Sequence, residues 1–405
     1  MNASIFIARR IRENKEKSFS STVVKIAVTS IAIAIAVLII AFAILQGFKD
    51  NIQNKLFSFS GHIQVNKLDD NESYVENPVP VRSFIEGNKS LNKEISHIQA
   101  YATKAGLLKT EEEVTGVLLK GVDHNVDSNK IKQNLVAGNF IKFEDSTFSK
   151  EIIISDHVSK KLKLKVNDVV WMYFIQNPPR YRKLKVAGIY QTGLEEFDDL
   201  YIFGDLKLIR QLNNWPDSLV GGYEIYVKDF SQLKKTAYKI RDAMDYDMSL
   251  MMITDKYLQI FDWLHLLNRN AYIFMVLILF VACFNMVSTI LIMVMERTNM
   301  IGVLKALGAT DDQVRKIFLF NGFNIIVRGV FWGNLVGLGF CVIQYYFHII
   351  PLDAANYYMN HVPIKWDWTA ILLVNLICFI TVTIILFIPL VIIPRIRPIN
   401  AIKFK

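Results

Sequence analysis

Long stretches without charged residues constrain this 405-residue chain more than any other feature. A helix needs about 20 mostly apolar residues to cross the hydrocarbon of a bilayer, and buried helices of soluble domains are usually shorter. The stretches predict transmembrane helices at residues 26–46, 268–295, 325–350 and 368–394. A signal peptide is not expected, although Ala41-Phe42-Ala43 imitates a cleavage site, because its apolar region spans only about 7–15 residues.

Basic residues flank these helices unequally. Residues 1–25, 296–316 and 395–405 hold fourteen Lys and Arg, whereas Lys365 is the only one between the third and fourth helices. Lys and Arg concentrate in cytoplasmic loops, so the lead, the loop and the tail are predicted to be cytoplasmic, with both termini inside. Residues 47–265, inserted between helices 1 and 2, are then extracytoplasmic.

The net charge of +9 reflects this topology. Residues 47–265 hold 29 basic and 30 acidic residues, so the excess positive charge belongs to the rest of the chain. The large domain therefore offers no basic face for nucleic acid. Cys283, Cys341 and Cys378 all fall within predicted helices, which excludes a disulfide-stapled outer domain.

The outer domain is predicted to be α+β, in one or two subdomains. Alternating and β-branched patterns predict strands in YRKLKVAGIY and GGYEIYVKDF, and EIIISDHVSKKLKLKVNDVVWMYFI predicts a strand, a helix, a turn at Asn167-Asp168 and a second strand. Apolar residues at helical spacing predict a helix over residues 231–248. The first transmembrane helix is expected to continue outward until a strand begins near His62, and the second is expected to begin within residues 258–267.

No enzymatic motif is present. The sequence contains no GxxxxGK[ST], HExxH, CxxC or GxSxG, and its seven histidines are scattered singly. We therefore expect no catalytic residue, no metal site and no cofactor of its own.

A stripe of small residues marks the third predicted helix. Gly329, Gly333 and Gly337 recur every four residues, and Gly322 lies one heptad earlier. Such stripes allow close helix contact. The partner is either another helix of the same chain or the same helix of a second copy.

The stretch ERTNMIGVLKALGAT (Glu296–Thr310) follows the second transmembrane helix directly. Its spacing predicts a short helix with Ile301, Leu304 and Leu307 on one face, and with Arg297 and Lys305 toward water. Such an apolar face can dock in a partner's groove or can be an ordinary amphipathic connector. Gly308 is a suitable C-cap.

ERTNMIGVLKALGAT also resembles the signature E-R-x-x-E-I-G-x-x-[KR]-A-[LI]-G-A of the MacB/FtsX-like permease superfamily, although Asn299 or Met300 stands at its second Glu. The one-helix, large-domain, three-helix plan is similar as well. The N-terminal segment resembles the lipoprotein-releasing (LolC/LolE-like) ABC permeases, whose first helix closes with a GFE-like turn; here the turn is Gly47-Phe48-Lys49.

The resemblance implies a permease of the bacterial inner membrane with a periplasmic MacB-like core domain at residues 47–265. It works by mechanotransmission, driven by a separate LolD-like ABC ATPase dimer that binds ATP and Mg, and pairs with a second permease copy as a homodimer or heterodimer. The cytoplasmic coupling helix at residues 296–316 would contact the ATPase through Glu296, Arg297, Ile301, Gly302, Leu304, Lys305, Ala306, Leu307 and Gly308.

Lipoprotein substrates are implied too. Their lipid would enter from the outer leaflet between helices 1 and 2, where we expect contacts with Leu45, Phe48, Leu267 and Phe274. A LolA-like periplasmic chaperone would receive the lipoprotein at a protruding hairpin. Two prolines cannot donate ladder hydrogen bonds, so the hook is expected to leave the sheet at Asn177, Pro178, Pro179, Arg180 and Tyr181. The alternative is simply a long hairpin.

Two other functions fit the same superfamily. One is a MacB-like exporter that drives periplasmic substrates outward. The other is an FtsX-like signalling subunit that controls cell-wall hydrolases, whose outer domains are typically smaller than this one. The N-terminal resemblance and the hairpin favour lipoprotein release.

Overall fold

The computed structural model describes residues 19–68, 76–81, 89–144, 147–353, 357, 359–391 and 393–395. Most of the predicted cytoplasmic lead and all but the first residue of the tail lie outside the described residues. The chain forms two compact units, a helical unit within Met1–Asp50, Trp263–Pro351 and His361–Lys405 and an α/β unit within Asn51–Asp262 and Leu352–Asn360.

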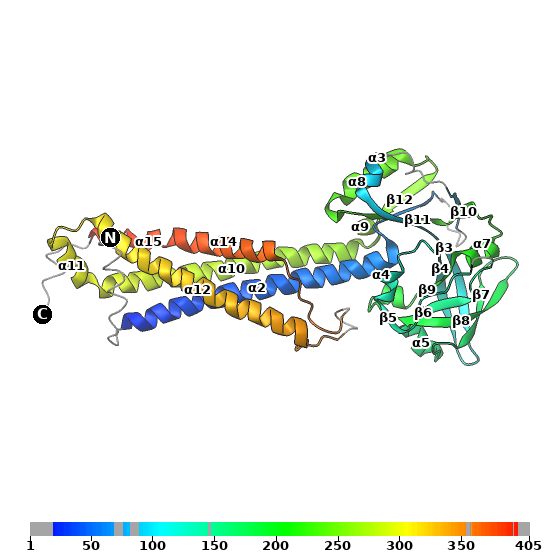
Figure 1. The fold of residues 1–405 in the computed structure, drawn as a ribbon, viewed down its shortest axis with the longest axis horizontal. Helices are drawn as coiled ribbons and strands as arrows, with labels where there is room; N and C mark the ends of the chain where they lie inside the picture. The colour runs from blue at the N-terminus through cyan, green and yellow to red at the C-terminus, as the bar shows by residue number, and fades with distance from the viewer. Residues whose placement is uncertain are drawn as a thin grey trace. The chain divides into compact units, whose positions relative to one another are not determined.

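Among the described residues, four helices are long and apolar enough to cross a membrane. They are α2 (Phe19–Ser60), α10 (Leu258–Glu296), α12 (Asp311–Phe347) and α14 (Trp368–Ile385), the last followed by α15 (Phe387–Leu390) and the 3-10 turn η2 (Ile393–Arg395) (Figure 1). α2 has 42 residues and α10 has 39, more than a bilayer requires, which confirms that both extend beyond their apolar stretches.

The turn expected at Gly47-Phe48-Lys49 is wrong, because these residues lie inside α2. Gly47 is needed for another reason. A Cβ atom there would lie 2.6 Å from the Pro363 carbonyl oxygen, so the segment before α14 crosses α2 in direct backbone contact. The Lys365 N–H also donates to the Ala43 carbonyl at 3.1 Å, and its ammonium pairs with Asp50 at 2.6 Å.

The stripe on α12 packs against α2 of the same chain. A Cβ at Gly329 would meet Ile31, one at Gly333 would meet the Ala32 carbonyl at 2.8 Å, and one at Gly337 would meet the Ala36 Cα at 3.0 Å. Small residues let two backbones approach this closely. The glycine stripe therefore packs against another helix of the same chain, which is the first of the two predicted alternatives.

Neutral polar side chains make further contacts between the long helices. Asn334 on α12 and Asn375 on α14 exchange amide hydrogen bonds at 2.6 and 2.9 Å, and each also donates to the carbonyl four residues earlier in its own helix. The Asn285 amide on α10 donates to Ser30 Oγ on α2 at 2.6 Å. An apolar core surrounds these contacts and includes Ile35, Met286, Phe318 and Val374.

The α/β unit contains twelve strands and short helices among the described residues (Figure 1). The strands are β1 (Ile63–Lys67), β2 (Val79–Pro80), β3 (Ile95–Lys109), β4 (Val114–Val122), β5 (Leu135–Gly138), β6 (Glu151–Ser155), β7 (Val169–Phe174), β8 (Arg180–Tyr190), β9 (Tyr201–Asp205), β10 (Leu219–Val220), β11 (Gly222–Val227) and β12 (Met248–Met252). The helices are α3 (Lys89–Glu94), α4 (Ser128–Lys132), α5 (Asp156–Leu162), α6 (Glu195–Asp198), α7 (Leu206–Asn213), η1 (Phe230–Gln232), α8 (Leu233–Ala243) and α9 (Ile253–Lys256).

Ten strands form one sheet in the order β12-β1-β11-β3-β4-β9-β6-β8-β5, with β7 pairing both β3 and β8. The pairings β3-β4-β9-β6-β8-β7 therefore return to β3 and close a ring. Among the strands that the structure describes, only β4–β9 and β6–β8 pair in parallel. The strands and the helix predicted over residues 151–190 and the strand predicted within residues 221–230 are confirmed. The helix predicted over residues 231–248 is present as α8, but it ends at Ala243 and Met248 already belongs to β12.

Candidate functional site

The predicted coupling helix is α11 (Thr298–Ala306), between α10 and α12. It ends in a Schellman motif: the Gly308 N–H donates to the Lys305 carbonyl at 3.0 Å, and the Ala309 N–H to the Leu304 carbonyl at 2.9 Å. Gly308 has a φ of +91°, which favours glycine even though a Cβ would meet no atom within 4 Å. Gly308 therefore ends this helix as the sequence predicts.

The start of α12 is fixed as firmly. Thr310 and Gln313 form a capping box, in which Thr310 Oγ1 accepts from the Gln313 N–H and Gln313 Oε1 accepts from the Thr310 N–H. Asp311 and Asp312 in the first turn suit the positive end of the helix dipole. The connector is thus a short helix held at its C-terminus by defined backbone geometry.

The apolar face expected on α11 is wrong in part. Ile301 is fully buried in the core of the helical unit, Gly302 is buried, and Leu304 is half-buried. Leu307 is 80% exposed, and Val303, which the sequence pattern did not single out, is 50% exposed. Ile301 and Leu304 hold α11 on its own chain, and Val303, Ala306 and the C-cap residue Leu307 are its exposed apolar residues.

Lys305 is the second correction. Its side chain is only 10% exposed rather than facing water, and its ammonium lies 2.7 Å from the Asp311 carboxylate and 2.9 Å from the Ile393 carbonyl. It therefore ties α11 to α12 and to the segment after α15. Glu296 is exposed and Arg297 is half-buried.

The expected chaperone hook lies between β7 and β8, but it is shorter than predicted. Arg180 and Tyr181 belong to β8, opposite Phe174 and Tyr173, so the tip is confined to residues 175–179. Asn177, Pro178 and Pro179 are exposed, and the Asn177–Pro178 peptide bond is cis.

Arg180 anchors the hairpin instead of presenting itself at the tip. Its guanidinium donates to the Gln211 and Leu212 carbonyls at 3.0 and 2.9 Å and to Asn214 Oδ1 at 3.2 Å. These acceptors lie at the C-terminal end of α7, where free carbonyls attract cations. Local sequence patterns could not predict this contact, because Arg180 and its acceptors are more than 30 residues apart.

The hairpin also carries an aromatic stripe that the sequence reasoning missed. Trp171, Tyr173 and Tyr181 are each at least 40% exposed, and the Tyr181 ring centroid lies 5.6 Å from that of Trp171 and 5.8 Å from that of Tyr173. The alternating burial along β7 places these rings on its outer face, opposite Val170, Met172 and Phe174. That alternation was visible in the sequence VVWMYF.

The predicted lipid-contacting residues lie in the helical unit. Leu45, Phe48 and Leu267 are half-buried, whereas Phe274 is 62% exposed. Phe48 on α2 packs edge-on against Trp263 on α10, with ring centroids 5.5 Å apart. The two helices thus meet through large aromatic side chains at this level.

The described residues hold no group of three or more His, Cys, Asp or Glu side chains able to bind a metal ion.

Two family models match the chain. The MacB-like periplasmic core domain matches residues 26–243, more than half of the chain, and the FtsX-like permease C-terminal domain matches residues 272–398. The boundary between the two matches falls just before the apolar stretch of α10.

Curated relatives are similar over nearly their whole length. The lipoprotein-releasing system transmembrane protein LolC of Neisseria meningitidis is 24% identical, covering 89% of this chain and 88% of the relative. LolE of Haemophilus influenzae is 21% identical with 92% of each covered, and LolC of Buchnera aphidicola is 23% identical with 94% of this chain and 93% of the relative covered. The chain therefore belongs to the MacB/FtsX-like ABC transporter permeases, in which a MacB-like periplasmic core domain is joined to an FtsX-like permease domain.

Proposed function

We propose that this chain is the permease subunit of an ABC transporter that extracts lipoproteins from the outer leaflet of the bacterial inner membrane. The proposal is supported by relatives named for lipoprotein release that align along almost their full length. In this arrangement both termini and α11 are cytoplasmic, and the α/β domain is periplasmic, as the fourteen-to-one distribution of basic residues favours.

Energy reaches the permease through α11. The observation that carries this step is the pair Val303 and Leu307, two exposed apolar side chains four residues apart on a helix held in place by Ile301 and Lys305. A rigid helix with a small apolar patch fits a groove on a partner. The partner is a LolD-like ATPase dimer, and ATP and Mg belong to that dimer.

Substitution of Leu307 by Asp tests the ATPase contact. A charge on this patch should abolish co-purification of the ATPase while the permease still inserts, because the Leu307 side chain is 80% exposed and has little packing to lose. Lys316→Glu is the control, since it adds an acidic charge at an exposed position of the next helix, α12. Assembly of the Leu307→Asp permease with its ATPase would refute this docking site.

The hairpin between β7 and β8 receives the chaperone. Its exposed Pro178 and Pro179, beside the stripe of Trp171, Tyr173 and Tyr181, form an apolar projection that Arg180 holds in place. Replacing residues 177–179 by Gly-Ser-Gly should abolish capture of a LolA-like chaperone. Tyr246→Ser is the control, because Tyr246 is 98% exposed elsewhere on the domain. Unchanged capture would reject the hook.

The lipid enters between α2 and α10 near Leu45, Phe48, Leu267 and Phe274, and a second permease copy completes the transporter. The decisive experiment is the release of radiolabelled lipoprotein from proteoliposomes that contain the permease, the ATPase and the chaperone. ATP hydrolysis without release would reject lipoprotein extraction and leave a MacB-like exporter.

A further inference from the structure

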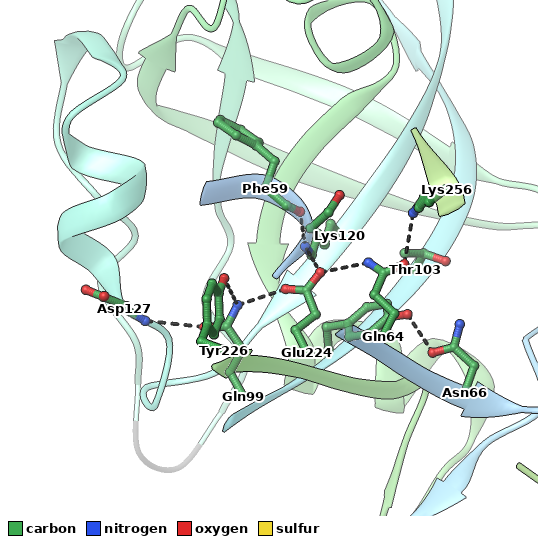
Figure 2. A network of polar contacts seen from close by, with 12 residues as sticks. Phe59, Gln64, Asn66, Gln99, Thr103, Lys120, Asp127, Glu224, Tyr226 and Lys256 are labelled. Carbon is green, nitrogen blue, oxygen red and sulfur yellow. Dashed lines mark hydrogen bonds and ion pairs between the residues drawn. The ribbon is translucent and has the colours of Figure 1, made fainter. Parts of the chain in front are cut away.

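α2 ends at Ser60 and α10 begins at Leu258, and both points lie in the α/β unit. A cluster of polar and charged side chains surrounds them inside the domain (Figure 2). It contains Lys120 of β4 and Glu224 of β11, whose side chains are 4% and 0% exposed. None of the proposed contacts with an ATPase, a chaperone or a lipid uses this cluster.

Lys120 fastens the end of α2. Its ammonium donates to the Phe59 carbonyl and lies 2.6 Å from the Glu224 carboxylate (Figure 2). The Phe59 carbonyl belongs to the last turn of α2, where carbonyls lack partners within the helix and attract cations. Gly61, at a φ of +59°, then brings the chain so close that a Cβ there would lie 3.0 Å from the Cβ of Glu224.

Glu224 connects Lys120 to residues near the start of α10. Its carboxylate accepts from the amides of Gln64 and Gln99, each at 2.9 Å. The side-chain oxygen of Gln64 accepts in turn from the ammonium of Lys256 at 3.0 Å, two residues before α10 begins. A continuous series of hydrogen bonds, the helix-end network, thus joins Phe59, Lys120, Glu224, Gln64 and Lys256 (Figure 2).

A second contact runs parallel to the network. Ser60, the last residue of α2, lies 3.1 Å from the hydroxyl of Tyr257, the residue before α10. Burial lowers the pKa of Lys256, and the Lys120 ammonium lowers it further while Glu224 opposes both. Taken as a whole residue, Lys256 is exposed, so the series of contacts runs from the buried Lys120–Glu224 pair out to the surface of the domain.

Such a network is a costly way to build a core. Removing charges from water carries a desolvation penalty, and replacing a buried ion pair with apolar side chains is often neutral or stabilising. Hydrogen bonds and ion pairs, however, fix the distance and direction between the groups that they join, and apolar contacts do so less strictly. Here the fixed distances run from the last turn of one long helix to the residues before another.

We propose that the helix-end network is a mechanical coupling, which holds the end of α2 and the start of α10 to one sheet so that movement of either helix displaces the whole α/β domain. The inference rests on the proposed function, in which movement driven by ATP passes through the helices to the domain. Lys120 and Glu224 are then positioning residues.

The first experiment does not depend on transport. The full chain is reconstituted in lipid nanodiscs, and backbone hydrogen exchange is measured at residues 57–62 and 256–262. The test variant combines Lys120→Met with Glu224→Gln, which removes both charges together. The control combines Lys239→Met with Glu94→Gln, an ion pair between α8 and α3 of the same domain that does not contact either helix end.

Exchange in the test variant should be faster at both segments by about tenfold, the order of change expected when a hydrogen bond to a charged group is lost. The control should match the wild type. A change at only one segment, or at neither, overturns the coupling.

The second experiment separates coupling from mere stability. With the ATPase and the chaperone present, the number of lipoproteins released per ATP hydrolysed is compared among the three chains. The test variant should keep ATP hydrolysis and lose most of the release per ATP, because the helices would then move without displacing the domain. An unchanged ratio overturns the proposal even if exchange increases.

A failure of the proposed function would look different. The wild-type chain would then hydrolyse ATP with its partner and release no lipoprotein at all. In that case the exchange experiment decides alone: faster exchange at both segments supports the coupling, and no change overturns it.

Discussion

The helix α2 is held in opposite ways along its length. In the helical unit it meets α12 through glycines, so that the Gly333 position lies directly against the Ala32 backbone. In the α/β unit its end is held by the Lys120 ammonium and the Glu224 carboxylate. The first contact depends on the absence of side chains, and the second depends on charge.

The difference follows from the surroundings. Helices in hydrocarbon gain nothing from burying apolar surface against each other, so close packing and neutral hydrogen bonds hold them. The Asn334–Asn375 exchange is of this kind. A water-exposed domain has a hydrophobic core to stabilise it and can accommodate a buried ion pair, provided that every charge has partners. The two regions should therefore respond differently to the same type of substitution.

The largest effect is expected in the α/β unit. Lys120→Met leaves the buried carboxylate of Glu224 without its cation and should lower the free energy of unfolding by about 3–5 kcal/mol. Adding Glu224→Gln should recover much of this loss. Pulse proteolysis of the full chain measures both, with the exposed Lys163→Met as a control. If Lys120→Met alone were as stable as the wild type, the charged contact of the α/β unit would not differ in this way from the glycine contact of the helical unit.

Acid should destabilise the same unit through His62, whose ring is packed by Phe57, Tyr226 and Phe230. Burial chiefly, and the Lys130 ammonium next, lower the pKa of His62 from 6.5 to about 4. The unfolded chain then binds the proton more readily, so stability is full above pH 6.5 and falls by on the order of 3 kcal/mol as the pH drops toward 4.

The measurement is unfolding at several pH values for the wild type and for His62→Gln. The Gln side chain can still accept from the Val227 N–H, as Nδ1 of His62 does at 3.0 Å. The variant should lack most of this dependence, and an equal slope in both proteins would contradict the assignment.

In the helical unit, the glycine contact should show a smaller but specific effect. Gly333→Val would place carbon against the Ala32 carbonyl and the Ile35 Cβ, both 2.8 Å from an ideal Cβ, and should cost about 1–3 kcal/mol by overpacking. Gly339→Val, on the same helix with no atom within 4 Å, should cost much less. Unfolding in mixed micelles compares them. Equal losses would mean that the helix itself, rather than the contact, resists substitution.

The smallest effect is expected for the amide pair. Asn334→Leu and Asn375→Leu should show a coupling of roughly 1 kcal/mol in a double-mutant cycle, the usual range for hydrogen bonds between membrane helices. Each amide retains its bond to the preceding turn, which limits the loss. A coupling as large as that between Lys120 and Glu224 would erase the distinction between the two regions.

Local sequence patterns predicted those structural features that depend only on residues close together in the sequence. The glycine period, the helical stop at Gly308 and the strands around β7 and β8 all follow from spacings of a few residues. The helix-end network did not follow, because Lys120 lies 61 residues from Phe59 and 104 from Glu224. A lysine in a strand predicts a solvated side chain until the partners are known.

The coupling helix shows the same limit at shorter range. Helical spacing predicted one apolar face of Ile301, Leu304 and Leu307, but it could not say which of these residues the chain itself covers: Ile301 is buried and Leu307 is exposed. Lys305 was predicted to face water because local spacing does not show how α11 packs against α12. It also does not show that the Ile393 carbonyl lies beside the Lys305 ammonium. Exposure is a tertiary property, so the partner-facing residues became visible only with the fold.

Gly47 restricts how α2 can move. The Pro363 carbonyl rests on the helix at the one position that lacks a side chain, and Lys365 bonds to the helix on either side of it, at Ala43 and Asp50. A screw motion of α2 that advances it by one residue would bring the side chain of Gln46 or Phe48 under that carbonyl. Such a motion past this segment is therefore blocked, unless residues 363–365 move with the helix.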